Sequence, residues 1–284
     1  MPRSLAAVAL VAAASLVVYL PIISSLVRQW ASDENYSHGF LIVPFAVFFG
    51  WQQRRALLRE PMRPSAWGAV LVAFSLLLLA AGVLGAELFL SRVSLIGIVA
   101  GSIVFLWGWR HLRRLAFPVL FLLLMVPLPA IVFNQVAFPL QLLASRAGEA
   151  VISTAGIPVV REGNILVLPS TTLEVAEACS GIRSLVSLLA LGLVMGKLRE
   201  PRRWARVVLA FLTIPVAIVA NAARVAGTGL MAQWIGPAAA QGFFHEFSGW
   251  VVFVLALALL MGVARMLSRT ALAVPRRRAA MEVS

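Results

Sequence analysis

The sequence predicts an all-α integral membrane protein with about eight transmembrane helices, an outer loop that carries a short hairpin, and one interfacial or re-entrant segment. Hydrophobic residues make up 61% of the 284 residues and charged residues only 12%, a balance that soluble globular domains do not have. The mean hydropathy of +0.95 indicates that lipid is the solvent. Apolar runs near the length of a bilayer-spanning helix, roughly 20 residues, alternate with short basic clusters.

The apolar runs indicate one transmembrane domain, residues 1–284. The first run is longer than a signal-peptide core, so it is interpreted as an uncleaved span. The segment 134–155 is too polar for a lipid-facing span and is expected at the outer interface or as a re-entrant helix. We expect the spans at about 5–27, 38–51, 67–86, 93–109, 115–133, 180–196, 206–228 and 247–267.

The distribution of charge predicts the orientation. If 134–155 does not cross, 18 of the 24 lysines and arginines fall in the two termini and the loops on their side of the membrane. Basic loops remain cytoplasmic, which places both termini in the cytoplasm and most acidic residues outside. The net charge of +13 is thereby explained by topology, and a nucleic-acid partner is excluded.

The one long outer loop, 156–178, alternates apolar and polar residues around 165–168 and 173–176. Gly163 and Asn164 lie between polar and apolar stretches and are typical turn residues, so a short hairpin is expected there. This hairpin would deliver Cys179 to the membrane surface.

Cys179 is the single cysteine of the chain, so any function it has is that of a free thiol. It opens the sixth predicted span at the outer end, Arg224 lies near the outer end of the seventh, and His245 directly precedes the eighth. Because consecutive spans usually pack as neighbours, the three side chains are expected to converge.

This triplet has the chemistry of cysteine acyl transfer. A helix N-terminus favours the thiolate of Cys179 over the thiol, and Arg224 or protonated His245 would favour it further. Ser180 and Gly181 let a substrate carbonyl approach the backbone, whose N–H groups, or the Arg224 guanidinium, would stabilise an oxyanion. His245 would protonate the leaving amine and activate the incoming nucleophile.

Each residue also has a structural interpretation. A lone cysteine is commonly a packing residue, and His245 can be an interfacial histidine. Arg224 can pair with Glu177 or Glu246, although an arginine in an apolar helix is a functional candidate by default. Asn221, one turn before Arg224, either orients it or joins two helices.

Further polar residues belong to the same outer layer. Tyr36, Ser37 and His38 either line the site or serve as cap and aromatic belt. Glu174 and Glu177 are also candidates to balance Arg183 or Arg224 or to contact a cationic substrate; their structural interpretation is a solvated loop face. The three histidines are dispersed and form no ligand pair, so neither a metal nor a cofactor is expected.

Four motifs, taken together, resemble the exosortase and archaeosortase family of membrane proteins. They are YSHGF at 36–40, EACSGIRSL at 177–185, NAAR at 221–224 and HEFSGW at 245–250. The resemblance implies a sortase-like cysteine transpeptidase or protease with Cys179, Arg224 and His245 as its catalytic residues. Its implied partners are proteins with a C-terminal signal, consisting of a Pro-Glu-Pro-like motif, a transmembrane helix and a basic tail, together with membrane lipids and an unknown acceptor.

The resemblance also implies a bacterial inner membrane protein associated with exopolysaccharide synthesis, with its active site on the outer face. Binding of a substrate helix would need small residues, for which Gly192 and Gly196 are candidates. Two alternatives remain open from the residues alone. One is an exopolysaccharide-linked transporter or assembly component, and the other is a transferase that acts on lipid-linked substrates.

Overall fold

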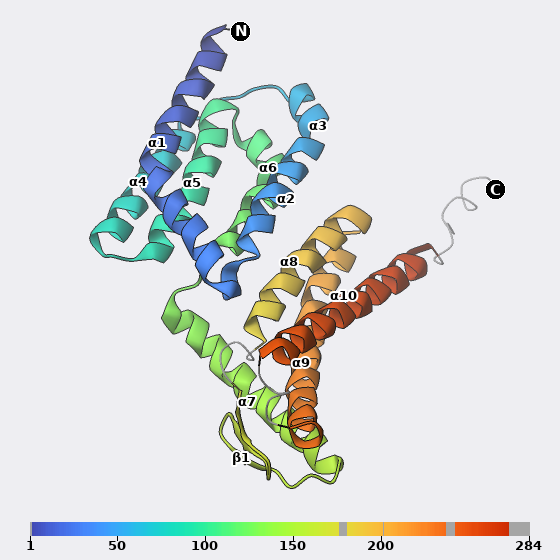
Figure 1. Ribbon diagram of the computed structural model, residues 1–284. Helices are drawn as coiled ribbons and strands as arrows, with labels where there is room; N and C mark the ends of the chain where they lie inside the picture. Colours follow the sequence, from blue (N-terminus) through green and yellow to red (C-terminus); the bar gives the residue numbers. More distant parts are fainter. Residues whose placement is uncertain (1, 176–180, 201, 237–241, 273–284) are drawn as a thin grey trace, which may run out of the picture. The chain divides into compact units, whose positions relative to one another are not determined.

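Helices form nearly all of the regular structure in the computed structural model, which describes residues 2–175, 181–200, 202–236 and 242–272 (Figure 1). They fall into two compact units, residues 1–133 and 134–284. The elements are α1 (Pro2–Ser32), η1 (Glu34–Tyr36), α2 (Gly39–Gln52), α3 (Arg54–Arg59), α4 (Trp67–Leu84), α5 (Leu88–Leu106), α6 (Trp109–Phe121), η2 (Leu122–Met125), α7 (Ala130–Thr154), β1 (Val160–Glu162), β2 (Ile165–Val167), β3 (Thr172–Glu174), α8 (Ile182–Arg199), α9 (Arg203–Trp234) and α10 (Gly242–Leu272).

The first unit is built on the α4–α5 hairpin, whose helices touch through small residues. Gly97 faces the Ser75 side chain and Gly101 faces the backbone of Val72, so neither position has room for a side chain. In a bilayer such close backbone contact replaces the hydrophobic effect as the source of helix association. Helix α1 is tied to the unit by the Trp30 indole, which donates a 3.0 Å hydrogen bond to the carbonyl oxygen of Met125.

The segment 115–133 is not one continuous helix, and its crossing of the membrane stays a prediction. Helix α6 ends at Phe121, the 3₁₀ turn η2 follows, and α7 begins at Ala130. Pro127 and Pro129 fall in the break. Proline disfavours helical conformation in the residue before it and removes a backbone donor, so the apolar run cannot remain one helix.

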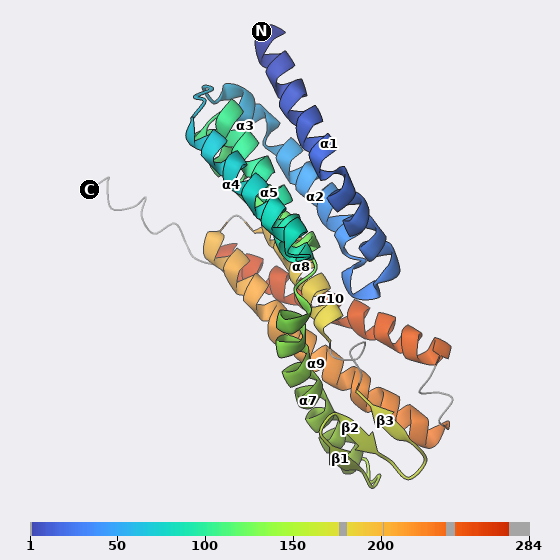
Figure 2. The same ribbon diagram turned by 90° about the vertical axis from the view of Figure 1, so that its left-hand side faces the viewer.

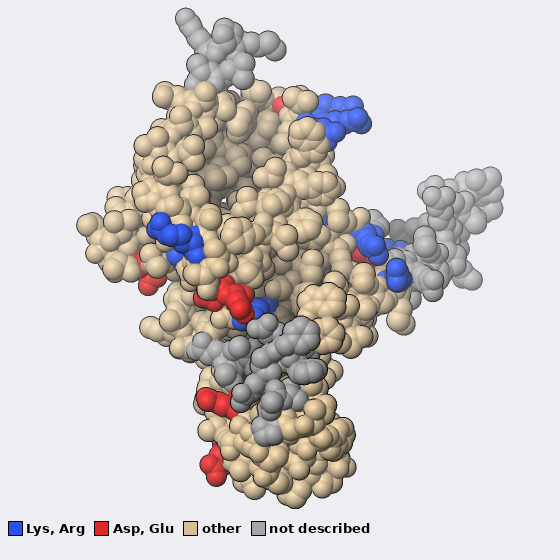
Figure 3. Space-filling model, in the orientation of Figure 1, with Lys and Arg blue, Asp and Glu red and all other residues tan. Residues whose placement is uncertain are grey.

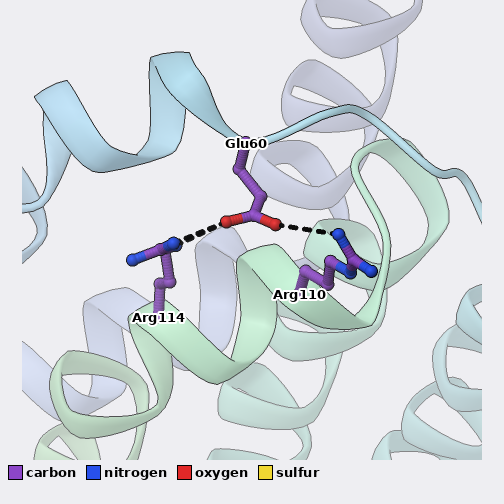
Figure 4. A network of polar contacts seen from close by, with 3 residues as sticks. All are labelled: Glu60, Arg110 and Arg114. Atoms are coloured by element: carbon purple, nitrogen blue, oxygen red, sulfur yellow. Dashed lines mark hydrogen bonds and ion pairs between the residues drawn. The ribbon is translucent and has the colours of Figure 1, made fainter.

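In the first unit, Glu60 at the C-terminal end of α3 forms a charged cluster with two arginines of α6 (Figure 4). The Glu60 carboxylate accepts hydrogen bonds from Arg114, at 2.8 and 2.6 Å, and from Arg110 at 3.4 Å. The bond from Arg114, with a smaller contribution from Arg110, lowers the pKa of the Glu60 carboxyl below its ordinary value. The basic loops of the sequence are therefore partly neutralised within the protein.

The second unit contains a bundle of α8, α9 and α10 (Figure 1). Leu188, Ala217 and Ala256 form a buried cluster, one residue from each helix. Beside the bundle, α7 and a three-stranded antiparallel sheet pack against the C-terminal part of α9 (Figure 2). Ile152 and Leu166, both fully buried, are the centre of this second cluster.

The predicted turn at Gly163 and Asn164 is confirmed, because Glu162 pairs with Ile165 across it. The structure adds a strand that was not predicted, β1, on the near side of that turn. Polar residues of α7 bind this sheet: Ser145 donates a 3.0 Å bond to the Gly163 carbonyl oxygen, and Glu149 accepts one of 2.8 Å from Arg161. Two polar side chains of the segment 134–155 thus hold the sheet against α7.

The described residues include five helices long and apolar enough to cross a membrane, or six if the bent pair around the prolines counts as one span. Large apolar side chains such as Phe211 and Leu84 are exposed on them, and charges are few on the face drawn in Figure 3. The chain is therefore an all-α integral membrane protein. Helix α2 has only 14 residues, so the count of eight spans stays a prediction.

Candidate functional site

The N-terminus of α8 is where the sequence places the nucleophile. Cys179, Glu177 and Ser180 lie outside the described residues, which resume at Gly181. Helix α8 begins at Ile182, two residues later than predicted, so Cys179 precedes the N-cap Gly181 by two positions. Gly181 has φ of +78°, a left-handed conformation that glycine adopts without strain, and its carbonyl oxygen accepts the first helical bond from Leu185.

Asn221 of α9 packs directly on Gly181. A Cβ added at Gly181 would lie 2.8 Å from Asn221 Cγ and 2.9 Å from its Cβ, closer than any real contact. Asn221 is buried, with 4% of its surface exposed. A pocket of about 10 Å³ beside it, lined by apolar residues that include Leu140 and Leu185, has room for no more than about one water. Gly181, the residue directly before α8, is therefore held against α9 beside a small apolar cavity.

Arg224 lies one turn further along α9 and packs on α10. A Cβ added at Gly249 would lie 3.0 Å from Arg224 Cζ and 3.1 Å from Nη2, so the guanidinium rests on a stretch of α10 that carries no side chain. Arg224 is partly buried. His245 and Glu246 belong to α10, and position 245 comes four residues before Gly249. Their side chains lie outside the described part of the structure.

Three of the motifs found in the sequence therefore meet in the second unit. Gly181 of EACSG contacts Asn221 of NAAR, and Arg224 of NAAR contacts Gly249 of HEFSG. The sequence did not predict a role for Gly249 of HEFSGW; its spacing of four residues from His245 was the signal that could have identified it. Direct contact among Cys179, Arg224 and His245 stays a prediction.

The remaining candidates are placed as follows. Arg183 is partly buried in the first turn of α8. Tyr36, Ser37 and His38 lie in the first unit and bind residues of that unit: His38 Nε2 is 3.1 Å from the Leu124 carbonyl oxygen, and Ser37 donates to the Glu34 carbonyl oxygen. His38 makes no side-chain capping bond to α2. Their role in a catalytic site stays a prediction.

The assignment of Gly192 and Gly196 to a substrate helix is wrong. Both are buried in the bundle, where Gly192 faces Thr213 of α9 and Gly196 faces Arg206 of the same helix. Small residues permit close helix contact, but the sequence does not say with which helix. Here they bring α8 and α9 of the same chain together.

Replacing Gly181 by alanine should destabilise the protein more than the same change at Gly156. Both glycines have similar positive φ angles, +78° and +80°, so both variants incur the left-handed penalty of about 1–2 kcal/mol. Only Gly181 would in addition collide with Asn221, since nothing lies within 4 Å of Gly156. Thermal unfolding of the purified variants in detergent measures the difference. Equal midpoints would show that the Gly181–Asn221 contact is not tight.

The comparisons with known proteins give one match. The family model for the transmembrane exosortase (Exosortase_EpsH) matches residues 30–262, which is most of the chain and includes all four motifs. No curated protein and no solved structure matches. Membership gives the chain a general role in the membrane, that of a sorting-related transpeptidase. With three of the family-like motifs in contact around α8, α9 and α10, and the family model covering them all, the chain belongs to the transmembrane exosortase family.

Proposed function

We propose that this exosortase is a membrane-embedded cysteine transpeptidase with Cys179 as nucleophile, Arg224 as the oxyanion-binding cation and His245 as general acid and base. Its substrates would be proteins with a C-terminal sorting signal, made of a Pro-Glu-Pro-like motif, a transmembrane helix and a basic tail. Family membership supports the class of reaction. The assignment to residues comes from the sequence motifs, and contacts of the described residues near them support it.

The observation that carries the proposal is a pair of contacts in which side chains of α9 pack on glycines of the neighbouring segments. Asn221 fixes the backbone two residues after Cys179, and Arg224 rests on α10 four residues after His245. On a helix, positions four apart share a face, so position 245 lies on the side of α10 that Arg224 contacts. One turn of α9 therefore contacts both Gly181 and Gly249, and these contacts support the proposal that the three catalytic positions lie close together.

The length of α9 supports a site at one membrane surface. From Arg203 to Arg224, α9 is about 32 Å long at 1.5 Å per residue, close to the thickness of the hydrocarbon core. The start of α9 is next to a basic cluster that includes Lys197 and Arg199, which favours the cytoplasmic side. Arg224 would then be at the outer boundary, facing the periplasm of a bacterial inner membrane.

The reaction would proceed through a thioester. The Cys179 thiolate attacks the carbonyl carbon of the scissile peptide, and the oxyanion that forms is stabilised by Arg224. The C–N bond breaks as His245 protonates the leaving amine, which releases the transmembrane tail. An acceptor nucleophile, deprotonated by the now neutral His245, then attacks the thioester carbonyl carbon, and the C–S bond breaks to regenerate the Cys179 thiolate and protonated His245. Water in place of the acceptor would make the enzyme a protease.

A reporter carrying the three-part signal, co-expressed with the enzyme, tests the proposal. Mass spectrometry of the processed reporter should find a new C-terminus near the motif, and any attached mass identifies the acceptor. A reporter that keeps the transmembrane helix and basic tail but has its motif scrambled is the control and should stay intact. If neither reporter is cut in membranes that contain the enzyme, the transport or lipid-transferase interpretation takes precedence.

Replacing Gly249 by leucine should reduce reporter processing by about 100-fold, since a displacement of about 1 Å at a catalytic group costs this much. The leucine side chain would push the Arg224 guanidinium off α10. Gly262→Leu, in the same helix but with nothing within 4 Å of the added Cβ, is the matched control and should retain near-normal activity. The readout is the initial rate of processing at equal enzyme levels. Equal rates for the two variants would mean that the position of Arg224 is unimportant.

A further inference from the structure

The first unit contains a large apolar groove that the proposed reaction does not use. Its volume is about 440 Å³, within the range of small-molecule pockets, roughly 300–1,000 Å³. It lies between α1, α2, α5 and η2, and its walls are apolar side chains such as Leu26, Trp30 and Met125. Several of these are buried, Trp30 to 6% exposed and Met125 to 4%, so the groove penetrates the unit.

A buried arginine, Arg92, lies one helical turn before the residues of α5 that line the groove and is not itself a lining residue. Leu95, Ile96 and Val99 line the groove, and Arg92 completes the spacing i, i+3, i+4, i+7 that defines one helix face. Arg92 is 3% exposed although it begins only the second turn of an apolar helix. A buried positive charge in an apolar helix is energetically costly unless a polar or anionic group binds it.

The partners of Arg92 within the described residues leave this charge uncompensated. One Nη2–H donates a long 3.4 Å bond to the Ser25 hydroxyl. Nε is buried without a hydrogen-bond acceptor, and no carboxylate among the described residues forms an ion pair with it. A neutral hydroxyl does not balance a full positive charge.

We propose that the groove binds one anionic phospholipid, with its phosphate on Arg92 and one acyl chain along the apolar wall. A guanidinium binds phosphate oxygens through two parallel N–H bonds, which would satisfy Nε. Arg92 is about 6 Å from the start of α5, a depth suited to a head group at the membrane surface. Because an acyl chain is as well solvated in the bilayer as in the groove, the phosphate contact decides the selectivity.

Native mass spectrometry of the purified protein with equimolar phosphatidylglycerol and phosphatidylcholine of identical chains tests this site. The wild type should retain one phosphatidylglycerol with at least tenfold preference. Arg92→Gln should lose that preference. The control is Arg28→Gln, which should keep it, because Arg28 is an exposed arginine of α1 predicted on the same side of the membrane as Arg92. Glycerol phosphate, which lacks acyl chains, should not displace the bound lipid.

A second variant keeps the test decisive if Arg92→Gln fails to fold. Val99→Phe fills the groove and leaves Arg92 in place, so it should also reduce lipid retention at least tenfold.

Equal retention of the two lipids by the wild type, or full retention by a folded Arg92→Gln, would overturn the proposal. Loss of reporter binding in Arg92→Gln with lipid retention unchanged would likewise overturn it and assign the arginine to the peptide substrate. Lipid retention is measured without turnover, so the result does not depend on the proposed reaction.

Discussion

Replacing Cys179 by alanine or serine is expected to eliminate processing of a sorting-signal reporter, a decrease of at least about 10³-fold in rate. Alanine has no nucleophile, and the serine hydroxyl is far less ionised near neutral pH than a thiol. The measurement is the fraction of reporter cleaved over time, at enzyme levels matched by immunoblot of the membrane fraction. An intact membrane level excludes simple loss of the protein.

The single cysteine allows a second, independent measurement of the same prediction. A thiol-alkylating reagent has only one cysteine to modify in this chain, so the modified protein should gain one adduct and lose activity in proportion. Cys179→Ser should gain no adduct. Undiminished processing by either variant, or by fully alkylated enzyme, would eliminate the covalent mechanism and leave Cys179 as a packing residue.

Replacing Arg224 by lysine is expected to slow processing by about 10²–10³-fold, the range observed when one donor is removed from an oxyanion site. Lysine retains the charge but is a point donor on a flexible stem, and it cannot reproduce the planar guanidinium that lies on Gly249. The decrease should appear in kcat more than in KM, because the lost contact is made to the transition state.

Arg146→Lys is the matched control for Arg224, since Arg146 is exposed on α7 and should tolerate the change. Thermal unfolding of both variants separates a catalytic effect from a structural one. A fully active Arg224→Lys enzyme would reduce Arg224 to a structural charge. A variant that is inactive only because it unfolds at lower temperature would lead to the same conclusion.

The sequence alone predicted the fold class, the turn at Gly163 and Asn164, and three motifs that meet in the second unit. These features depend on local information. Hydropathy determines which segments enter lipid, and residues such as glycine and asparagine determine where a chain can turn. Even the unusual position of Arg224 was evident, because a charge in an apolar helix stands out in one dimension.

Only the tertiary structure decided which segments touch. Gly249 became part of the site because α10 crosses α9 where the Arg224 guanidinium lies, whereas Gly192 and Gly196 turned out to join α8 to α9. Small residues look alike in a sequence whether they face a neighbouring helix, a substrate or lipid, since the crossing of helices is set by non-local packing. For the same reason a ligand site near Arg92 could be proposed only from the tertiary structure, in which α1, α2 and α5 enclose an apolar groove.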